Sequence, residues 1–246
     1  MQAGAAIPIS FAEEIMNIHA IYAQIFNVWR QKRMAEFEAN IQPRAEDLVL
    51  DVGGYPGTWT TRPQLTKRID CLNLHEVNWD GSRYPNHQIT TSVGDGCSLA
   101  YENSCYDILF SNSVIEHVGD WDKQQAFAQE MRRVGRRLWI QTPAFECPIE
   151  PHFLAPFVHW LPVYVRRRIL RWFTPWGWIQ KPAQDKIDET ITYTQLLTKK
   201  QFKELFPDCV IITERLLWIF PKSYIAYRTN SEQADAVNAL PRVTDP

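Results

Sequence analysis

The sequence predicts an α/β protein with a Rossmann-like, doubly wound sheet of seven mixed strands, an N-terminal helix and an aromatic helical insertion after the fifth strand. Short apolar runs alternate with helical stretches from residue 46 onward, and strands separated by crossover helices favour a parallel sheet. Two long strand candidates near the end of the chain are joined by a short connection, which allows an antiparallel pair at one sheet edge. Residues 151–181 differ in composition from both flanks, which marks an insertion.

The length and composition fit a globular protein with a sizeable core. The 246 residues are 45% hydrophobic and 22% charged, with 10 Gly and 16 Pro, which excludes disordered, collagen-like and disulfide-scaffold classes. The 26 basic and 28 acidic side chains give a net charge of −2, so we expect no nucleic-acid partner. The five cysteines form no C-x-x-C pair and no histidine spacing suggests a ligand set, so we expect no metal site.

The sequence also carries information about location. Its first residues lack the basic, apolar and small-residue regions of a secretory signal, because Glu13 and Glu14 follow almost at once. The longest uncharged aromatic stretch, residues 151–165, contains three prolines and is shorter than the roughly 20 residues that a membrane span needs. We therefore expect a cytoplasmic protein, with peripheral membrane contact as an option.

A long helix is predicted before the first strand. Residues 11–39 repeat apolar side chains at spacings of three and four, and Ser10 with Glu13 forms a capping box at the start. We interpret this helix as structural, with a dimerising face as the alternative. The strand candidates that follow are residues 47–52, 68–74, 87–93, 106–112, 136–143, 209–219 and 223–229.

Further helices are expected over residues 57–67, 122–134 and 198–206. Asp122 and Gln125 resemble an N-terminal capping box, Gly135 stands where a helix ends, and residues 220–222 connect the last two strands. The expected parts of the chain are an N-terminal helical segment (1–44), a core (45–150), an insertion (151–190), a C-terminal helix with edge strands of the same core (191–230) and a tail (231–246).

The first strand candidate ends in a glycine-rich turn, LVLDVGGYPGTWT, in which Asp51 precedes Gly53, Gly54 and Gly57. Glycines at the carboxyl end of a first parallel strand let backbone N–H groups approach a ligand, in the crevice where doubly wound sheets bind cofactors. The dinucleotide fingerprint G-x-G-x-x-G is absent, so a nicotinamide enzyme is weakly supported. A plain strand-to-helix turn without a ligand is the alternative.

This turn resembles the first motif of the class I S-adenosylmethionine-dependent methyltransferases, an acid followed by alternating glycines. Further matches follow in order, with Asn73 at the end of the second strand candidate, Asp95 in VGDGCSL and SNSVIEHV after the fourth. The stretches TPAFECPIEPHFLAPFVHWLP and LLTKKQFKELFPD are similar to later parts of members that methylate small molecules or glycans. The resemblance covers residues 45–228 and implies S-adenosyl-L-methionine as cofactor. The cofactor-binding residues that it implies are Asp51, Gly53, Gly54, Tyr55, Gly57, Asn73, Asp95, Gly96 and Ser111.

Three positions depart from the family pattern. Tyr55 stands where the middle glycine is expected, so either the turn takes another course or the ring replaces a backbone contact. Asn73 replaces the acid that accepts from the ribose hydroxyls, which predicts a weaker, uncharged anchor. Pro63 is tolerated only in the first turn of a helix, so the helix after the glycines is expected to begin near Thr60 or Thr61.

Two histidines are candidates for the base that takes a proton from the acceptor, because imidazole can do so near neutral pH. His117 follows the fourth strand candidate in IEHV, and His152 lies in IEPH at the mouth of the insertion. We favour His152. In the alternative interpretation, His117 ties its loop to the next helix and Pro151-His152 forms a turn. The expected acceptor contacts are Glu150, Phe153 and Trp160.

The insertion combines aromatic and basic side chains. Residues 151–181 hold four of the ten Trp and five basic but no acidic side chains, so their net charge is +5 and that of the remainder −7. Residues 160–178 are interpreted as a helix that contacts an anionic membrane, as a lid over the acceptor, or as a cap packed on the sheet edge. Stacking on nucleic-acid bases is disfavoured by the acidic remainder.

These features together predict an S-adenosylmethionine-dependent O-methyltransferase that acts on a small molecule, a sugar or a lipid-linked intermediate. One alternative is a catalytically silent, methyltransferase-like module that binds a partner or a membrane, and another is a Rossmann-type oxidoreductase. The oligomeric state is left open.

Overall fold

The structure, a computed structural model, describes residues 29–229. The described residues fall into two compact units, residues 29–42 and residues 43–229. Within the described part of the first unit, a helix spans residues 29–41, so the predicted N-terminal helix is present there and ends two residues later than expected. Its predicted start over residues 11–28, with the Ser10 and Glu13 capping box, lies outside the described residues.

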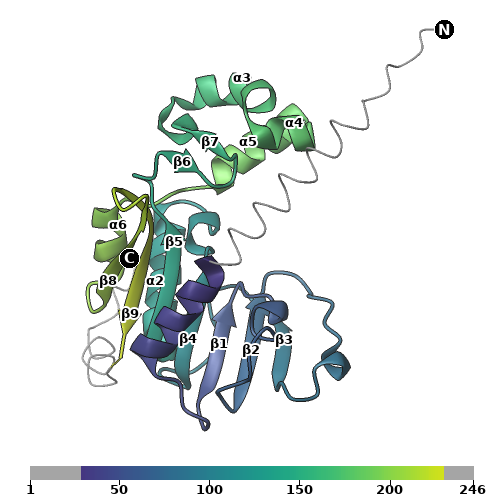
Figure 1. The fold of residues 1–246 in the computed structure, drawn as a ribbon, viewed down its shortest axis with the longest axis vertical. Helices are drawn as coiled ribbons and strands as arrows, with labels where there is room; N and C mark the ends of the chain where they lie inside the picture. Colours follow the sequence, from purple (N-terminus) through teal and green to yellow (C-terminus); the bar gives the residue numbers. More distant parts are fainter. Residues whose placement is uncertain (1–28, 230–246) are drawn as a thin grey trace, which may run out of the picture. The chain divides into compact units, whose positions relative to one another are not determined.

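The second unit is built on a mixed sheet of seven strands in the order β3-β2-β1-β4-β5-β9-β8, as predicted (Figure 1). The first five strands are parallel, whereas β9 runs antiparallel to both β5 and β8. Val49, Leu50, Ile108 and Leu109 are fully buried in the central pair, which explains the continuous apolar runs of a parallel sheet. The strands are β1 (Leu48–Val52), β2 (Arg68–Asn73), β3 (Ile89–Val93), β4 (Tyr106–Asn112), β5 (Gly135–Pro143), β8 (Val210–Leu216) and β9 (Phe220–Arg228).

The helix predicted over residues 57–67 is absent. A single 3-10 turn, η1 (Pro56–Thr58), is followed by turns and bends up to β2. The hydroxyls of Thr60 and Thr61 donate to the carbonyls of Gly57 and Thr58, each at 3.3 Å. These bonds compete with helical backbone bonds, and Pro63 has no N–H to offer, so the segment cannot continue as a helix.

The crossover between β4 and β5 is the predicted helix α2 (Trp121–Val134). Its N-cap is Asp120, whose carboxylate accepts from the Lys123 amide at 3.1 Å, so the predicted box at Asp122 and Gln125 is wrong by two residues. Gly135 ends the helix as predicted and also begins β5. A Cβ there would lie 2.5 Å from the Leu109 side chain, so close strand packing requires glycine at this position.

The chain ends in α6 (Lys199–Leu205) and the hairpin of β8 and β9. Thr198 and Gln201 form a complete capping box at the start of α6. The hairpin turns at residues 217–219 and not at 220–222 as predicted, because Phe220 and Pro221 are already paired with β8. Leu217 and Trp218 adopt left-handed backbone angles. Neither residue type favours this conformation, so the sequence does not predict the turn here.

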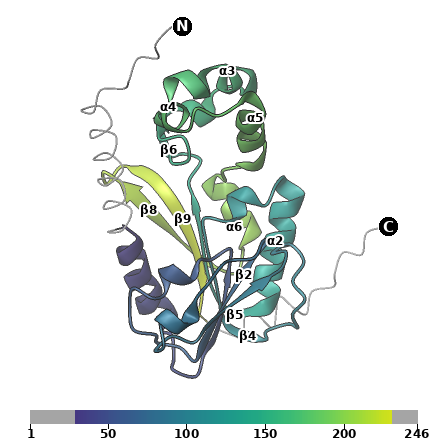
Figure 2. The same ribbon diagram turned by 90° about the vertical axis from the view of Figure 1, so that its right-hand side faces the viewer.

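One face of the sheet is covered by α2 and α6 (Figure 2). Phe127 and Met131 of α2 and Phe202 of α6 are fully buried, in one apolar cluster with Leu109 and Leu138 of the sheet. This cluster fixes the strands whose carboxyl ends carry the candidate site.

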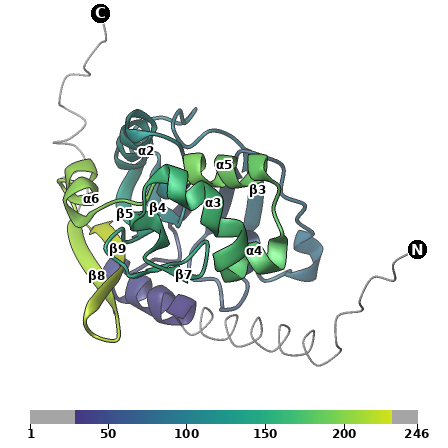
Figure 3. The same cartoon turned by 90° about the horizontal axis from the view of Figure 1, so that it is seen from above.

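The insertion leaves the sheet after β5 and lies beyond the carboxyl ends of the parallel strands (Figures 1 and 3). It has its own small core, made of Phe153, Ala155, Val158, Leu170, Ile187 and Ile191. No helix between residues 29 and 229 combines the length and apolar character needed to cross a membrane. The elements of the insertion are β6 (Ile149–Glu150), β7 (Ala155–Pro156), η4 (Val158–Trp160), α3 (Val163–Phe173), α4 (Pro175–Gln180) and α5 (Gln184–Tyr193).

Candidate active site

Asp51, near the carboxyl end of β1, is a buried carboxylate with an incomplete set of partners. Asp51 is only 1% exposed, and its Oδ2 accepts from the indole N–H of Trp59 at 2.7 Å. Oδ1 has no hydrogen-bond partner among the described residues. Burial raises the pKa of Asp51 to about 7, although the Trp59 hydrogen bond opposes this. A cation that reached Oδ1 would therefore be strongly favoured.

The two glycines after β1 are required by close contacts. Gly53 has a φ of +77°, donates its N–H to the Leu72 carbonyl at 2.7 Å, and would bring a Cβ within 2.4 Å of Val114. A Cβ at Gly54 would lie 1.7 Å from Oδ2 of Asp51. The loop therefore passes directly over the carboxylate, which only glycine permits.

Tyr55 and Asn73 are two of the three departures from the family pattern. Tyr55 is 59% exposed and its ring contacts Gly57, where a Cβ would lie 2.8 Å from the ring, so the phenol is not buried at the strand end. Asn73 ends β2 and donates its amide N–H to the Gly54 carbonyl at 2.9 Å. This bond holds the glycine loop and leaves the amide oxygen of Asn73 as an acceptor.

The remaining residues expected at the cofactor site have mixed roles. Asp95 is exposed and its Oδ1 accepts from the Cys97 amide at 2.8 Å. A Cβ at Gly96 would lie 2.8 Å from the Phe127 ring, so this glycine serves packing. Ser111 is buried and donates to the Val52 carbonyl at 2.9 Å, which ties β4 to β1. Gly96 and Ser111 thus have contacts inside the fold, and their contacts with the cofactor stay a prediction.

The second group of polar side chains lies after β4 and β5. The 3-10 turn η3 (Ile115–His117) follows β4, and its Glu116 is fully buried and accepts from the Thr142 hydroxyl of β5 at 2.9 Å. Glu150 is buried in β6 and accepts twice, from Nδ1 of His152 and from the Phe153 amide, both at 2.6 Å. Two buried carboxylates thus support the predicted histidines.

His117 and His152 face each other, with 3.0 Å between their Nε2 atoms and 4.7 Å between the ring centres. Burial opposes protonation of His152, but the hydrogen bond and charge of Glu150 outweigh it and raise the pKa. Burial and the neighbouring His152 lower the pKa of His117, while a hydrogen bond with the backbone of Tyr193 acts in the opposite direction. Because the Nδ1 atom of His152 bonds Glu150, Nε2 is the nitrogen of His152 that faces His117.

The structure thus brings together the two histidines predicted as bases, although they are 35 residues apart in the sequence. Glu150, expected to contact the acceptor, is buried and bonds His152. Phe153, also expected there, is buried against Trp176 in the core of the insertion. Trp160 remains exposed and donates to the Phe145 carbonyl at 2.9 Å. Sequence reasoning missed Glu116, whose only signal was an acid next to His117 in an otherwise apolar stretch.

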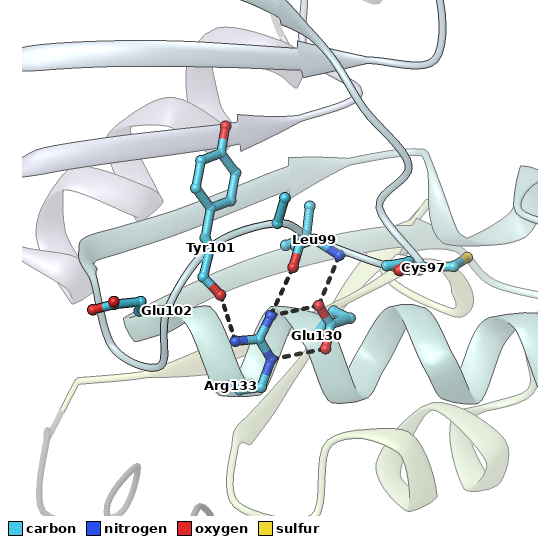
Figure 4. A pocket seen from close by; sticks show the side chains of 8 residues that line it. Cys97, Leu99, Tyr101, Glu102, Glu130 and Arg133 are labelled. Atoms are coloured by element: carbon cyan, nitrogen blue, oxygen red, sulfur yellow. Dashed lines mark hydrogen bonds and ion pairs between the residues drawn. The ribbon is translucent and has the colours of Figure 1, made fainter.

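A hollow of about 500 Å³ lies elsewhere, between the loop after β3 and helix α2 (Figure 4). Arg133 donates to Glu130 at 2.6 Å and to the carbonyls of Leu99 and Tyr101 at 3.0 and 2.6 Å. Glu130 also accepts from the Leu99 amide at 2.8 Å. These groups satisfy one another, so we assign the hollow a structural role.

Comparison with known proteins agrees with this geometry. A sequence profile of the methyltransferase domain family matches residues 50–137, which contain the glycine loop, Asn73, Asp95 and His117. This part of the chain, residues 50–137, is thus similar to the methyltransferase domain family, in agreement with the resemblance found in the sequence. Members of this family use S-adenosylmethionine as cofactor. No curated protein matches the chain.

Solved structures support the fold of the methyltransferase domain and nothing finer. A Rhodobacter sphaeroides protein provisionally described as a Zn-dependent alcohol dehydrogenase is 10% identical, with 80% and 87% of the two chains covered and a TM-score of 0.55. PH0226 from Pyrococcus horikoshii is 11% identical, with 83% and 91% covered and a TM-score of 0.51. YcgJ from Bacillus subtilis is 13% identical, with 75% and 71% covered and a TM-score of 0.50.

The residues at the end of β1 fit the cofactor of the family at two points. The unpartnered Oδ1 of Asp51 suits the ammonium group of the donor, and the free amide oxygen of Asn73 suits a ribose hydroxyl. Both atoms border the glycine loop, where the backbone approaches closely because no Cβ intervenes.

Proposed function

We propose that the protein transfers the methyl group of S-adenosylmethionine to a hydroxyl oxygen of a small molecule, a sugar or a lipid-linked acceptor. The observation that carries this proposal is a shared location: Asp51 lies near the end of β1, and His117 and His152 follow β4 and β5, at the same edge of the parallel sheet. When bound, S-adenosylmethionine supplies an electrophilic methyl group on a positively charged sulfur.

On the donor side, we assign three anchors to the chain. The carboxylate of Asp51 pairs with the ammonium group, and the amide oxygen of Asn73 accepts from the ribose. Asp95, which is exposed near the start of the loop after β3, accepts from the adenine. Gly53 and Gly54 let the main chain lie close to the ligand, because their contacts leave no room for larger residues.

On the acceptor side, the reaction requires an oxygen held in line with the methyl carbon and a group that takes up its proton. We assign both tasks to His117 and His152 acting as a pair, because their Nε2 atoms face each other and neither is directed elsewhere. Glu150 orients His152 and Glu116 lies behind the pair. These two carboxylates are positioning residues.

Titration with S-adenosylhomocysteine tests the donor half of the proposal. We expect saturable heat in isothermal calorimetry with the full-length protein, and unchanged binding after His75→Ala, which alters an exposed histidine outside the site. Transfer of a labelled methyl group to hydroxylated glycans or glycolipids would then identify the acceptor. Absence of saturation at millimolar ligand would contradict the assignment of the cofactor site.

The surface of the insertion supports an acceptor held at an anionic membrane. Trp172, Phe173 and Trp178 are 65%, 72% and 60% exposed, and the indole of Trp178 donates to the Trp172 carbonyl. The guanidinium of Arg171 lies 5.3 Å from the Trp172 ring centre, and residues 151–181 contain no acid. Aromatic rings beside cations are typical of surfaces that bind anionic lipids. This exposure disfavours the interpretation of these three residues as a packed cap.

A second apolar group lies at the same end of the sheet. Residues 217–219 form the tip of the β8–β9 hairpin and are strongly exposed. Because Ser223 of β9 pairs with Pro143 at the end of β5, this tip is on the side from which the insertion leaves. We propose that both groups contact the bilayer, which would bring a lipid-linked acceptor to the histidine pair.

Vesicle sedimentation tests this proposal. We expect the protein to sediment with vesicles that contain phosphatidylglycerol and far less with phosphatidylcholine alone, because the basic insertion is attracted by anionic headgroups. Combined Trp172→Ala and Trp178→Ala should reduce binding about tenfold or more, since each ring buries a large apolar area. Leu65→Ala, an exposed apolar side chain outside the insertion, is the control. Equal binding by both variants would argue against a membrane role.

A further inference from the structure

The point between His117 and His152 has the geometry of a metal site. Their two Nε2 atoms, 3.0 Å apart, and a carboxylate oxygen of Glu116 all lie within 4.8 Å of one another. Two nitrogen ligands at about 2.1 Å from one ion are separated by about 3.0 Å at an octahedral angle and by about 3.4 Å at the tetrahedral angle usual for zinc. The histidine spacing is therefore close to that of a bound ion, and Glu116 offers a third ligand oxygen within 4.8 Å.

Each of these three side chains is held by a second group in the way that metal ligands usually are. His152 donates from Nδ1 to the buried carboxylate of Glu150 at 2.6 Å, and His117 bonds the backbone of Tyr193. Glu116 accepts from the hydroxyl of Thr142 at 2.9 Å. A histidine whose Nδ1–H is taken by an oxygen has its lone pair on Nε2, which fixes the tautomer needed for ligation.

The surroundings of the pair leave room for an ion. Nδ1 of His152 is used by Glu150, so Nε2 is the nitrogen of His152 that faces His117, at 3.0 Å. A cation between the two Nε2 atoms would keep open coordination positions, because His117 is on the exposed side of the cluster.

We infer that Glu116, His117 and His152 bind a divalent transition-metal ion of the zinc class, with Glu150, Thr142 and Tyr193 as supporting groups. Two imidazoles and one carboxylate favour such an ion over magnesium or calcium, which prefer oxygen ligands. With the ion bound, the two histidines would be its ligands and no longer bases, and its open positions would suit the oxygen of the acceptor. The ion would lower the pKa of that hydroxyl, so that the proton leaves to water. This use of the ion rests on the proposed methyl transfer, but its binding does not.

The expectation that the sequence contains no metal site came from local spacing patterns. The ligands lie on η3 and just after β6, on two loops that meet only when β4 and β5 pair in register. A three-residue set of this kind leaves no signature such as H-E-x-x-H.

The inference is tested by spectroscopy on the full-length protein after removal of metal by chelation and dialysis. Titration with Co²⁺ alone is expected to give visible d–d absorption that saturates at one equivalent and disappears when Zn²⁺ is added. His117→Ala should abolish the band with little risk to folding, because that side chain is exposed. Glu150→Gln should weaken cobalt binding about 10- to 100-fold, although it leaves all three ligands in place.

His75→Ala is the matched control and should leave the cobalt titration unchanged, and circular dichroism should show that every variant is folded. A missing band, or a band that persists in both His117→Ala and His152→Ala, would overturn the site. Titration with S-adenosylhomocysteine on the same preparations separates the two proposals. Binding of S-adenosylhomocysteine without cobalt binding would contradict the metal site and leave the methyltransferase proposal standing. Cobalt binding without binding of S-adenosylhomocysteine would contradict the methyltransferase proposal and leave the metal site standing.

Discussion

Replacing Asp51 with Asn is expected to stabilise the ligand-free protein at pH 8 and to have little effect at pH 4. Burial raises the pKa of this carboxyl from 3.8 to about 7, so the folded state holds a proton that the unfolded state has already released over this range. Stability conferred by the protonated group is therefore complete below pH 3.8 and is lost as the pH rises toward 7. The loss is on the order of 4 kcal/mol, from about 1.4 kcal/mol per pKa unit.

Thermal unfolding at pH 4, 6 and 8 would measure this difference. The melting temperature of Asp51→Asn should exceed that of the parent by an amount that grows with pH, because the variant has no carboxylate to ionise. Asp95→Asn, at an exposed aspartate, should show no such trend. A constant difference between Asp51→Asn and the parent across the three pH values would show that burial does not control Asp51.

The same variant should bind S-adenosylhomocysteine at least tenfold more weakly than the parent at pH 8. The ammonium group of the ligand would supply the partner that Oδ1 lacks, and a charged hydrogen bond of this kind contributes about 1.5–3 kcal/mol. Because the ligand favours the ionised carboxylate, affinity in the parent should rise between pH 6 and 8, whereas that of the variant should stay flat. Calorimetry at pH 6 and pH 8 measures both affinities. Equal affinities of the parent and the variant would show that the ammonium group does not bind Asp51.

The sheet was predictable because its signals are local. Buried parallel strands have short runs of apolar residues. Val49 and Leu50 of β1 and Ile108 and Leu109 of β4 belong to such runs. The helix after the glycine loop failed because the Thr60 and Thr61 hydroxyls satisfy carbonyls of their own turn, a competition that apolar periodicity does not register. The apolar pattern therefore predicted the strands of the sheet, but it did not predict where side-chain hydrogen bonds would replace those of a helix backbone.

The site was predictable as residue types but not as an arrangement. His117 and His152 were found because histidines beside expected strand ends are few, yet their contact depends on the path of the insertion. The role of Glu150 depends on its burial beneath His152, and neighbouring sequence does not reveal whether a carboxylate faces solvent or a ring. Glu116 was missed for the same reason.

Asp208→Asn should cost about 3–5 kcal/mol of unfolding free energy, the usual result of breaking a buried ion pair from one side. Asp208 lies between α6 and β8, where it accepts from Arg132 of α2 at 2.6 Å and pairs with Arg228 of β9. The Arg228 side chain is fully buried and also donates to the carbonyls of Arg132 and Gly135, so its charge cannot be transferred to water. One carboxylate thus neutralises a cation that joins the helical layer to the sheet.

Urea unfolding of matched variants would measure the cost. Asp188→Asn removes an aspartate that also bonds a guanidinium twice, that of Arg167, but on the exposed surface of the insertion, and we expect no measurable change there. Replacing all three partners, Asp208→Leu with Arg132→Met and Arg228→Met, should recover most of the stability lost in Asp208→Asn, because the penalty comes from leaving a cation without its carboxylate. If the triple variant were as unstable as the single one, the hydrogen bonds from Arg228 to the backbone would be the dominant contribution and the ion pairs a minor one.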